Sequence, residues 1–215
     1  MKTLRNAVIA IFAGLILMIS CKKSDIALPK SEANIDSIAS KYYEGYLKMY
    51  PLEATMQGDS RYNDLLSNNI SSEFISKEIE FYTDTQKKLK SIDYDDLSDE
   101  QKTVYDVLDY TLKDKIERYA YHPELMPFSQ FEGLPLDFPL LGSAEGNQPF
   151  KTIKDYDNWL KRIDAFVIWM NTAEKNFREG MKQNVVLPKK LVVKMIPQMH
   201  SEEIISENFE KNIFY

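Results

Sequence analysis

Large apolar residues in this chain recur every three or four positions over long stretches, and this spacing constrains the fold more than any other feature. Such a period places side chains on one face of an α-helix, whereas a half-buried strand needs alternation at every second residue. No sustained alternation is present, and 7 glycines are few for a turn-dense β-protein of 215 residues. The sequence therefore predicts an all-α fold, a bundle of amphipathic helices.

Three of the helical stretches lie in the first half of the chain. The first runs over 35–50 and ends before Pro51, because proline disfavours helix in the residue that precedes it. Ser72 is a candidate N-cap of the second, and Ser98 opens the third with a Ser-x-x-Gln capping box. The residues expected to face inward are Ile35, Ile38, Ala39, Tyr42, Tyr43, Tyr46, Leu47, Tyr50, Ile75, Ile79, Tyr82, Leu89, Ile92, Val104, Val107, Leu108, Leu112, Ile116 and Tyr119.

The two remaining stretches follow residue 150. Thr152 is a candidate N-cap of the fourth and longest helix, and Pro188 can occupy the first position of the fifth. We expect an apolar seam of the fourth helix to face the bundle core. Its members are Ile153, Tyr156, Leu160, Ile163, Val167, Met170, Phe177 and Met181, with Glu174 as the one interruption.

Residues 121–150 interrupt the helical pattern. They contain five prolines and three glycines, so we expect a long Pro/Gly-rich loop without helix. A loop of this length in a compact domain is commonly functional or disordered, and its large apolar residues favour packing. Two interpretations stay open: a structural wrap across helix ends, which we place first, and a wall of a substrate cleft.

The N-terminus has the pattern of an export signal. Lys2 and Arg5 precede an uncharged apolar run that is too short to span a bilayer, so residues 1–20 are predicted to be a signal peptide. Cys21 follows Ser20 directly and resembles the lipid-modified cysteine of a bacterial lipobox; the alternative is a plain signal peptide with a chance cysteine. We therefore expect residues 21–30 to be a lipid-anchored tether, residues 31–215 to be the helical domain, and the protein to lie in the bacterial periplasm or at the outer membrane, with the membrane as its partner.

Familiar catalytic signatures are missing from the sequence. Neither His122 nor His200 begins an H-E-x-x-H helix, and a single cysteine cannot form an internal disulfide or a four-cysteine zinc site. We assign no catalytic and no metal-binding residue in this chain. A formal net charge of −6 argues against a nucleic-acid partner, because such binders usually carry a basic excess.

Three segments together resemble the bacterial family called domain of unknown function 885. Residues 50–62 are similar to its "P-x-x-A-T-x-x-G-x-x-R-Y/F" signature. Residues 155–163 are similar to its "D-Y-x-x-(Y/W)-L-x-R-(L/I)" helix. Residues 178–181, followed by Pro188 and 192–198, are similar to its "R-E-G…P…V…Q" segment. The order and spacing of the segments fit over roughly residues 35–200.

The resemblance implies a helical, exported, often lipid-anchored hydrolase that is considerably longer than this chain and looks like a zinc-dependent peptidase of the gluzincin type. The H-E-x-x-H helix of that family lies in the C-terminal half, which has no counterpart here, so zinc is expected only in the missing part. There zinc would acidify a bound water, and the motif glutamate would take its proton. This chain is then expected to be a truncated, non-catalytic N-terminal fragment that shapes the cleft for a peptide substrate.

Two other interpretations remain open. The chain could be a non-enzymatic helical binding lipoprotein of the cell envelope that captures glycans or peptides. It could also be a helical interaction module without a ligand. An in-frame continuation that carries H-E-x-x-H would decide for the peptidase.

Overall fold

The computed structural model describes residues 30–143, 146–200 and 209–211, with side chains from Ile35 onward. The chain divides into two units, Met1–Lys30 and Ser31–Tyr215. Cys21 and the predicted signal peptide lie outside the described residues. No helix in the described part is both long and apolar enough to cross a bilayer.

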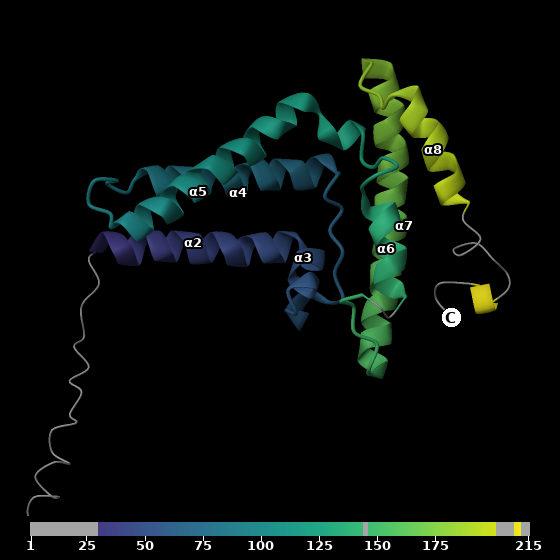
Figure 1. Ribbon diagram of the computed structural model, residues 1–215, viewed down its shortest axis with the longest axis horizontal. Coiled ribbons are helices and arrows are strands. Elements are labelled where there is room, and N and C mark those ends of the chain that lie inside the picture. The colour runs from purple at the N-terminus through teal and green to yellow at the C-terminus, as the bar shows by residue number, and fades with distance from the viewer. Residues whose placement is uncertain (1–29, 144–145, 201–208, 212–215) are drawn as a thin grey trace, which may run out of the picture. The chain divides into compact units, whose positions relative to one another are not determined.

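Every regular element in the described part of the chain is helical, which confirms the predicted all-α fold (Figure 1). The α-helices are α2 (Lys30–Met49), α3 (Pro51–Met56), α4 (Ser72–Lys90), α5 (Asp99–Glu117), α6 (Leu134–Gly142), α7 (Ile153–Gln183) and α8 (Lys189–Met199). Short 3-10 turns occupy Ser60–Tyr62, Arg118–Tyr121, Pro123–Leu125 and Phe209–Lys211.

Side-chain caps begin three of these helices close to where the sequence predicts them. The Ser98 hydroxyl accepts the Gln101 amide, and the Gln101 side chain accepts the Ser98 amide at 3.0 Å, so the predicted capping box of α5 is confirmed. Thr152 caps α7 as predicted, and Asp155 completes a second capping box. The N-cap of α4 is Ser71, one residue earlier than expected.

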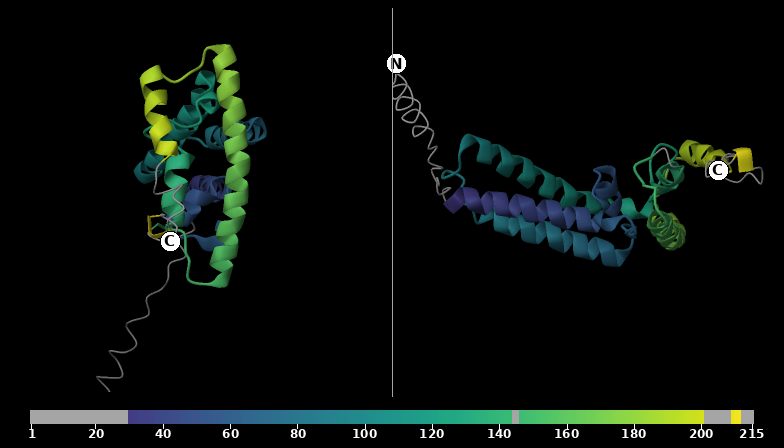
Figure 2. Two further views of the ribbon diagram at one scale, coloured as in Figure 1. Left: turned by 90° about the vertical axis from the view of Figure 1, so that its right-hand side faces the viewer. Right: turned by 90° about the horizontal axis from the view of Figure 1, so that it is seen from below.

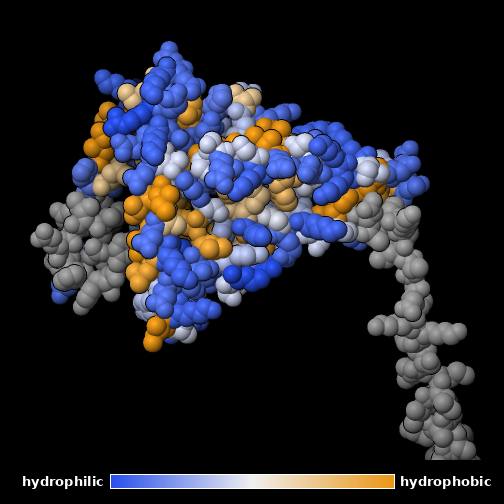
Figure 3. All heavy atoms as spheres, turned by 180° about the vertical axis from the view of Figure 1, so that it is seen from behind, coloured by the Kyte–Doolittle hydropathy of each residue, from blue (hydrophilic) through white to orange (hydrophobic). Residues whose placement is uncertain are grey.

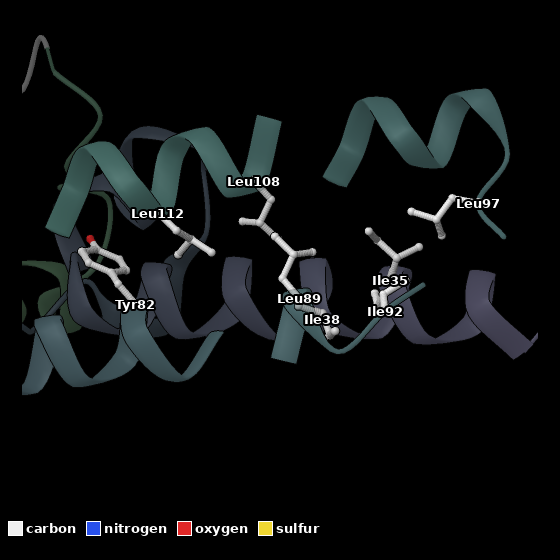
Figure 4. Close-up of a cluster of buried hydrophobic side chains, with 8 residues drawn as sticks. All are labelled: Ile35, Ile38, Tyr82, Leu89, Ile92, Leu97, Leu108 and Leu112. Carbon is white, nitrogen blue, oxygen red and sulfur yellow. The ribbon is translucent and has the colours of Figure 1, made fainter. Parts of the chain in front are cut away.

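The helices α2, α4 and α5 run side by side and enclose one hydrophobic core (Figures 2 and 4). Its buried members come from all three helices and from the connection between α4 and α5: Ile35, Ile38, Tyr82, Leu89, Ile92, Leu97, Leu108 and Leu112. These were expected inward positions, except Leu97. In contrast, Val104 and Val107 of α5 are exposed, Val107 at 62%, so their predicted inward orientation is wrong. The apolar residues of α5 span a wider face than the one it buries. Only the side of α5 that faces the core shared with α2 and α4 is buried.

The segment 121–150 contains a helix, contrary to the prediction. Helix α6 includes Pro135 in its first turn and Pro139 in its interior. Pro135 costs little, because the first backbone amides of a helix have no intrahelical partner anyway. Phe138 offsets the bond lost at Pro139, since its ring stacks on Trp159 at 4.5 Å and on Phe166 at 4.4 Å between centroids.

Helix α7 buries a different face from the predicted one. Most of the expected seam is exposed, with Ile153 at 84% and Leu160 at 59%. The buried face instead carries Trp159, Arg162, Trp169, Ala173 and Gly180, together with Asn158. The predicted orientation of this helix is therefore wrong, although its start and length are correct.

Helix α8 follows Pro188, which is its N-cap rather than its first helical residue. Only Met195 of its apolar set is buried. Four others are exposed: Val192, Val193, Ile196 and Met199. The side chain of Gln198 donates a hydrogen bond to the carbonyl of Gln130 at 3.0 Å, which ties α8 to the segment before α6.

Candidate functional site

A cleft of about 910 Å³ lies where the ends of α2 and α5 meet the segment 123–134 and α7. This volume falls in the usual range of small-molecule and peptide sites. Its lining includes Tyr46, Tyr50, Glu53, Ile70, Lys115, Arg118, Tyr119, Glu124, Met126, Phe128, Glu132, Leu134 and Trp169. The lining combines aromatic side chains, cations and carboxylates.

A buried carboxylate lies directly behind one wall of the cleft. Glu78 of α4 is only 2% exposed and accepts hydrogen bonds from the hydroxyls of Tyr50, Tyr82 and Tyr119. The Tyr82 bond is 2.5 Å long. An isolated buried carboxylate is costly, and three phenol donors compensate for the lost water. Because Tyr50 and Tyr119 line the cleft, Glu78 fixes the positions of two wall residues.

The tyrosines around Glu78 are held in the protonated form. Burial raises the pKa of Tyr50, Tyr82 and Tyr119, and the hydrogen bond to the Glu78 carboxylate raises each pKa further. Burial, with the nearby Glu53 charge, raises the pKa of Tyr46 to about 12. These tyrosines therefore stay uncharged even at alkaline pH values at which exposed tyrosines lose their proton.

Two cations lie on the cleft side of α5. Lys115 occupies its last turn, and Arg118 begins the 3-10 turn that follows. Residues three positions apart on a helix share a side, and both side chains line the cleft. Within the described residues, neither takes part in an ion pair, whereas Lys113 pairs with Asp109 at 2.6 Å.

The segment between α5 and α6 forms another wall. His122 adopts a left-handed backbone conformation with φ 51°, and the chain turns there into Pro123–Leu125. The Nδ1 atom of His122 lies 3.1 Å from Oε1 of Glu124, whose other oxygen is buried and has no partner among the described residues. Phe128 packs on Trp169 in a small second cluster. Part of the predicted loop is therefore both packed and in the cleft wall.

The buried Arg162 of α7 holds the segment after α2 in place. Its Nε atom donates to the Leu65 carbonyl at 3.0 Å, and Nη2 donates to the Tyr62 carbonyl at 3.1 Å and to Oγ1 of Thr55 at 2.7 Å. Nη1 donates to the side chain of Gln148. Burial lowers the pKa of Arg162 to about 10, so the guanidinium remains charged at neutral pH.

Two of the three segments that resemble the family signatures are in contact. Arg162 belongs to the second segment and contacts the first, which spans 50–62. Gly180 of the third segment lies against the cleft wall, because a Cβ atom there would come within 3.0 Å of the Leu125 carbonyl and 2.5 Å of the Val185 carbonyl. Arg162 and Gly180 therefore shape the cleft by packing, whereas Tyr50 and Glu53 of the first segment line it.

The predicted site residues have different outcomes. Cys21, the predicted lipid anchor, lies outside the described residues. No group of three or more His, Cys, Asp or Glu that could hold a metal occurs in the described part of the chain. Sequence reasoning missed Glu78 and the pair formed by Lys115 and Arg118. Glu78 had only one weak signal, a tyrosine four residues later at Tyr82.

The exposed face of α7 is apolar over four turns. In Figure 3 hydrophobic residues gather along the end of the view where α7 lies. Five exposed apolar residues of α7, which we call the α7 seam, follow the helical repeat: Ile153, Tyr156, Leu160, Ile163 and Val167. The exposed apolar residues of α8 belong to the same unit of the chain. A solvated helix would carry polar residues there.

Comparison with known proteins assigns the chain to a family. No curated protein and no solved structure matches it. Residues 51–213 match the family described as "Bacterial protein of unknown function (DUF885)", which covers most of the chain and includes the three segments that carry the resemblance. This protein belongs to that family.

Proposed function

We propose that this chain is the N-terminal, non-catalytic part of a larger exported hydrolase of the zinc-peptidase type, anchored to the membrane through a lipid on Cys21. In that role it shapes one side of a cleft for a peptide substrate. Family membership supports the proposal. The observation that carries it is the exposed α7 seam, which lies in the same unit as the cleft.

The α7 seam has the spacing of a helix that packs against another helix. Its residues follow one another in alternating steps of three and four, the repeat of an interhelical seam. Single exposed apolar residues are normal, but a continuous patch of more than a few hundred Å² usually marks an interaction surface. We therefore assign the seam to contact with a further helical part of the protein.

The described residues do not provide a zinc site. We assign no catalytic step to this part of the chain, because its sequence has no H-E-x-x-H motif. Its contribution to hydrolysis is binding and orientation of the substrate through the cleft wall. Activation of water belongs, in this proposal, to the rest of the protein.

Hydrophobic-dye binding tests the seam. We expect this chain alone to aggregate or bind the dye, and the chain with its natural continuation not to bind it. Leu160→Lys should reduce dye binding by the chain alone and destabilise the longer protein. Asp157→Lys, also on the exposed side of α7, is the matched control and should do neither. A monomeric chain with a sharp cooperative melt and no dye binding would contradict the proposal.

Radiolabelled fatty acid tests the anchor in the native host. The label should follow the wild-type protein and disappear in Cys21→Ala, because the cysteine carries the fatty-acid-bearing lipid. Ser24→Ala, three residues further along the tether, should keep the label. Labelling that persists in Cys21→Ala would reject the lipid anchor.

A non-enzymatic envelope binding lipoprotein is the second candidate. The mixed aromatic, cationic and acidic lining of the cleft favours it, because such a lining suits a bound glycan or peptide. The nucleotide sequence after the codon of Tyr215 separates the two. An in-frame H-E-x-x-H helix decides for the hydrolase, and a stop codon followed by unrelated sequence favours a binding role or a decayed gene.

A further inference from the structure

We propose that the cleft binds short peptides by their C-terminal carboxylate, with Lys115 and Arg118 as the cationic pair that receives it. The site is part of the substrate cleft of the proposed hydrolase and so rests on that proposed function. The proposal specifies which end of the peptide the cleft recognises and which kind of residue carries that end.

The two cations are available to a ligand. Among the described residues neither is paired with a carboxylate, although the chain as a whole has 33 acidic and 27 basic residues. Their place at the C-terminal end of α5 is favourable in itself, because cations there interact with the helix dipole. That interaction leaves their donor groups free to bind an anion in the cleft. The planar guanidinium of Arg118 matches a carboxylate through two parallel hydrogen bonds.

The acids in the lining restrict which anion fits. Glu53, Glu124 and Glu132 also line the cleft, so a multiply charged phosphate would meet repulsion. A single carboxylate attached to a chain of amide groups fits better.

The apolar part of the lining selects the side chain beside the carboxylate. Trp169, Phe128, Leu134, Met126 and Ile70 form this part. The Nε1 atom of Trp169 donates to Asn69 at 2.8 Å, which fixes the indole ring. A large apolar or aromatic residue gains most from burial against such a surface. The predicted ligand is therefore a peptide that ends in such a residue.

A pair of tripeptides tests the proposal with the full chain. Ala-Ala-Phe with a free carboxylate is compared with the same peptide as the C-terminal amide, and binding is followed by tryptophan fluorescence because Trp169 lines the cleft. We expect the acid to bind about tenfold more tightly than the amide, a difference of ~1.4 kcal/mol. Arg118→Gln should lower the affinity for the acid to that for the amide and leave the amide unchanged. Lys113→Gln is the matched control and should change neither affinity.

Three other results of the tripeptide experiment would each overturn part of the proposal. Equal affinities for acid and amide would overturn carboxylate recognition but leave the cleft as a peptide site, so the proposed function would stand. No binding of either peptide would overturn the site, while the dye experiment on the α7 seam would still test the proposed function separately. An equal loss for both peptides in Arg118→Gln, with unchanged circular dichroism, would also overturn the proposal, because the arginine would not then read the carboxylate.

Discussion

Arg162 and Glu78 are buried charged residues on helix faces where apolar residues are usual. Neither has an ion-pair partner among the described residues; uncharged oxygen and hydroxyl groups surround them instead. Each joins segments that are distant in the chain: Arg162 joins α7 to residues 55–65, and Glu78 joins α4 to the ends of α2 and α5. The hydrogen bonds of Arg162 and Glu78 therefore hold together the segments that form the cleft.

Arg162→Met should destabilise the protein strongly. Methionine fills a similar volume but donates no hydrogen bond, so the Tyr62 and Leu65 carbonyls lose their donor in the interior. An unsatisfied buried group costs ~1–3 kcal/mol, so the free energy of unfolding should fall by roughly 3 kcal/mol or more. Urea denaturation measures this change. Lys161→Met is the control, because its exposed pair with Asp64 contributes only ~0–1 kcal/mol; equal losses in the two variants would contradict the role of Arg162.

Glu78→Leu should likewise destabilise the bundle. The hydroxyls of Tyr50, Tyr82 and Tyr119 would lose their common acceptor, and hydrogen bonds to a charged group contribute ~1.5–3 kcal/mol each. The expected loss is a few kcal/mol in urea denaturation, together with weaker peptide binding in the cleft. Glu80→Leu changes an exposed residue of the same helix and should stay within ~0.5 kcal/mol of the wild type. A Glu78→Leu variant as stable as Glu80→Leu would show that the network contributes nothing.

At the scale of the element, α7 carries two stripes with the same period. The α7 seam follows 153, 156, 160, 163 and 167, and the inward stripe follows 159, 162, 166, 169 and 173, all buried except the half-buried Phe166. Both advance in steps of three and four. The inward stripe offers flat aromatic rings, the Arg162 guanidinium and the small Ala173, which pack against α6 and the segment after α2.

Substitutions in the two stripes should differ in cost. Leu160→Ala should change the free energy of unfolding of this chain by no more than ~0.5 kcal/mol, because Leu160 is mostly exposed. Trp169→Ala should cost ~3–5 kcal/mol, as the loss of a large buried aromatic side chain does. Thermal and urea denaturation of the two variants measure both values. If Leu160→Ala lowered the free energy of unfolding more than Trp169→Ala, the α7 seam would be the buried face, as its apolar pattern predicts.

At the scale of the whole molecule, the tyrosine cluster links stability to alkaline pH. The pKa values of Tyr46, Tyr50, Tyr82 and Tyr119 are all raised in the folded chain, mainly by burial. In the unfolded chain tyrosine titrates near pH 10. The folded state therefore holds protons that the unfolded state releases above this pH.

The urea midpoint should stay constant up to about pH 10 and fall steeply above it. Each protonated buried tyrosine can contribute at most ~1.4 kcal/mol of lost stability per pH unit in that range. Tyrosinate absorbance should rise together with unfolding rather than before it. Tyr82→Phe, which removes one of these titrating groups, should make the fall less steep. Ordinary titration of all tyrosines in the folded protein would contradict this linkage.

The sequence by itself determined where several of the helices begin or end. The capping box at Ser98 and the N-cap at Thr152 act within one helical turn, so local chemistry sets where α5 and α7 begin. Pro51 restricts the residue before it, so it sets where α2 ends. The three family-like segments could also be recognised from the sequence, since they depend on order and spacing alone.

Only the tertiary structure decided which faces are buried and which residues meet in the cleft. Two stripes of equal period leave the orientation of α7 undetermined until Phe138 stacks between Trp159 and Phe166. Helix α6 forms in spite of Pro139 because that stacking offsets a missing backbone bond. Glu78 finds its donors up to 41 positions away, and Arg162 finds acceptors 97 and more positions away. Local spacing carries no information on such distant partners, since burial and hydrogen bonding between them arise only when the helices pack.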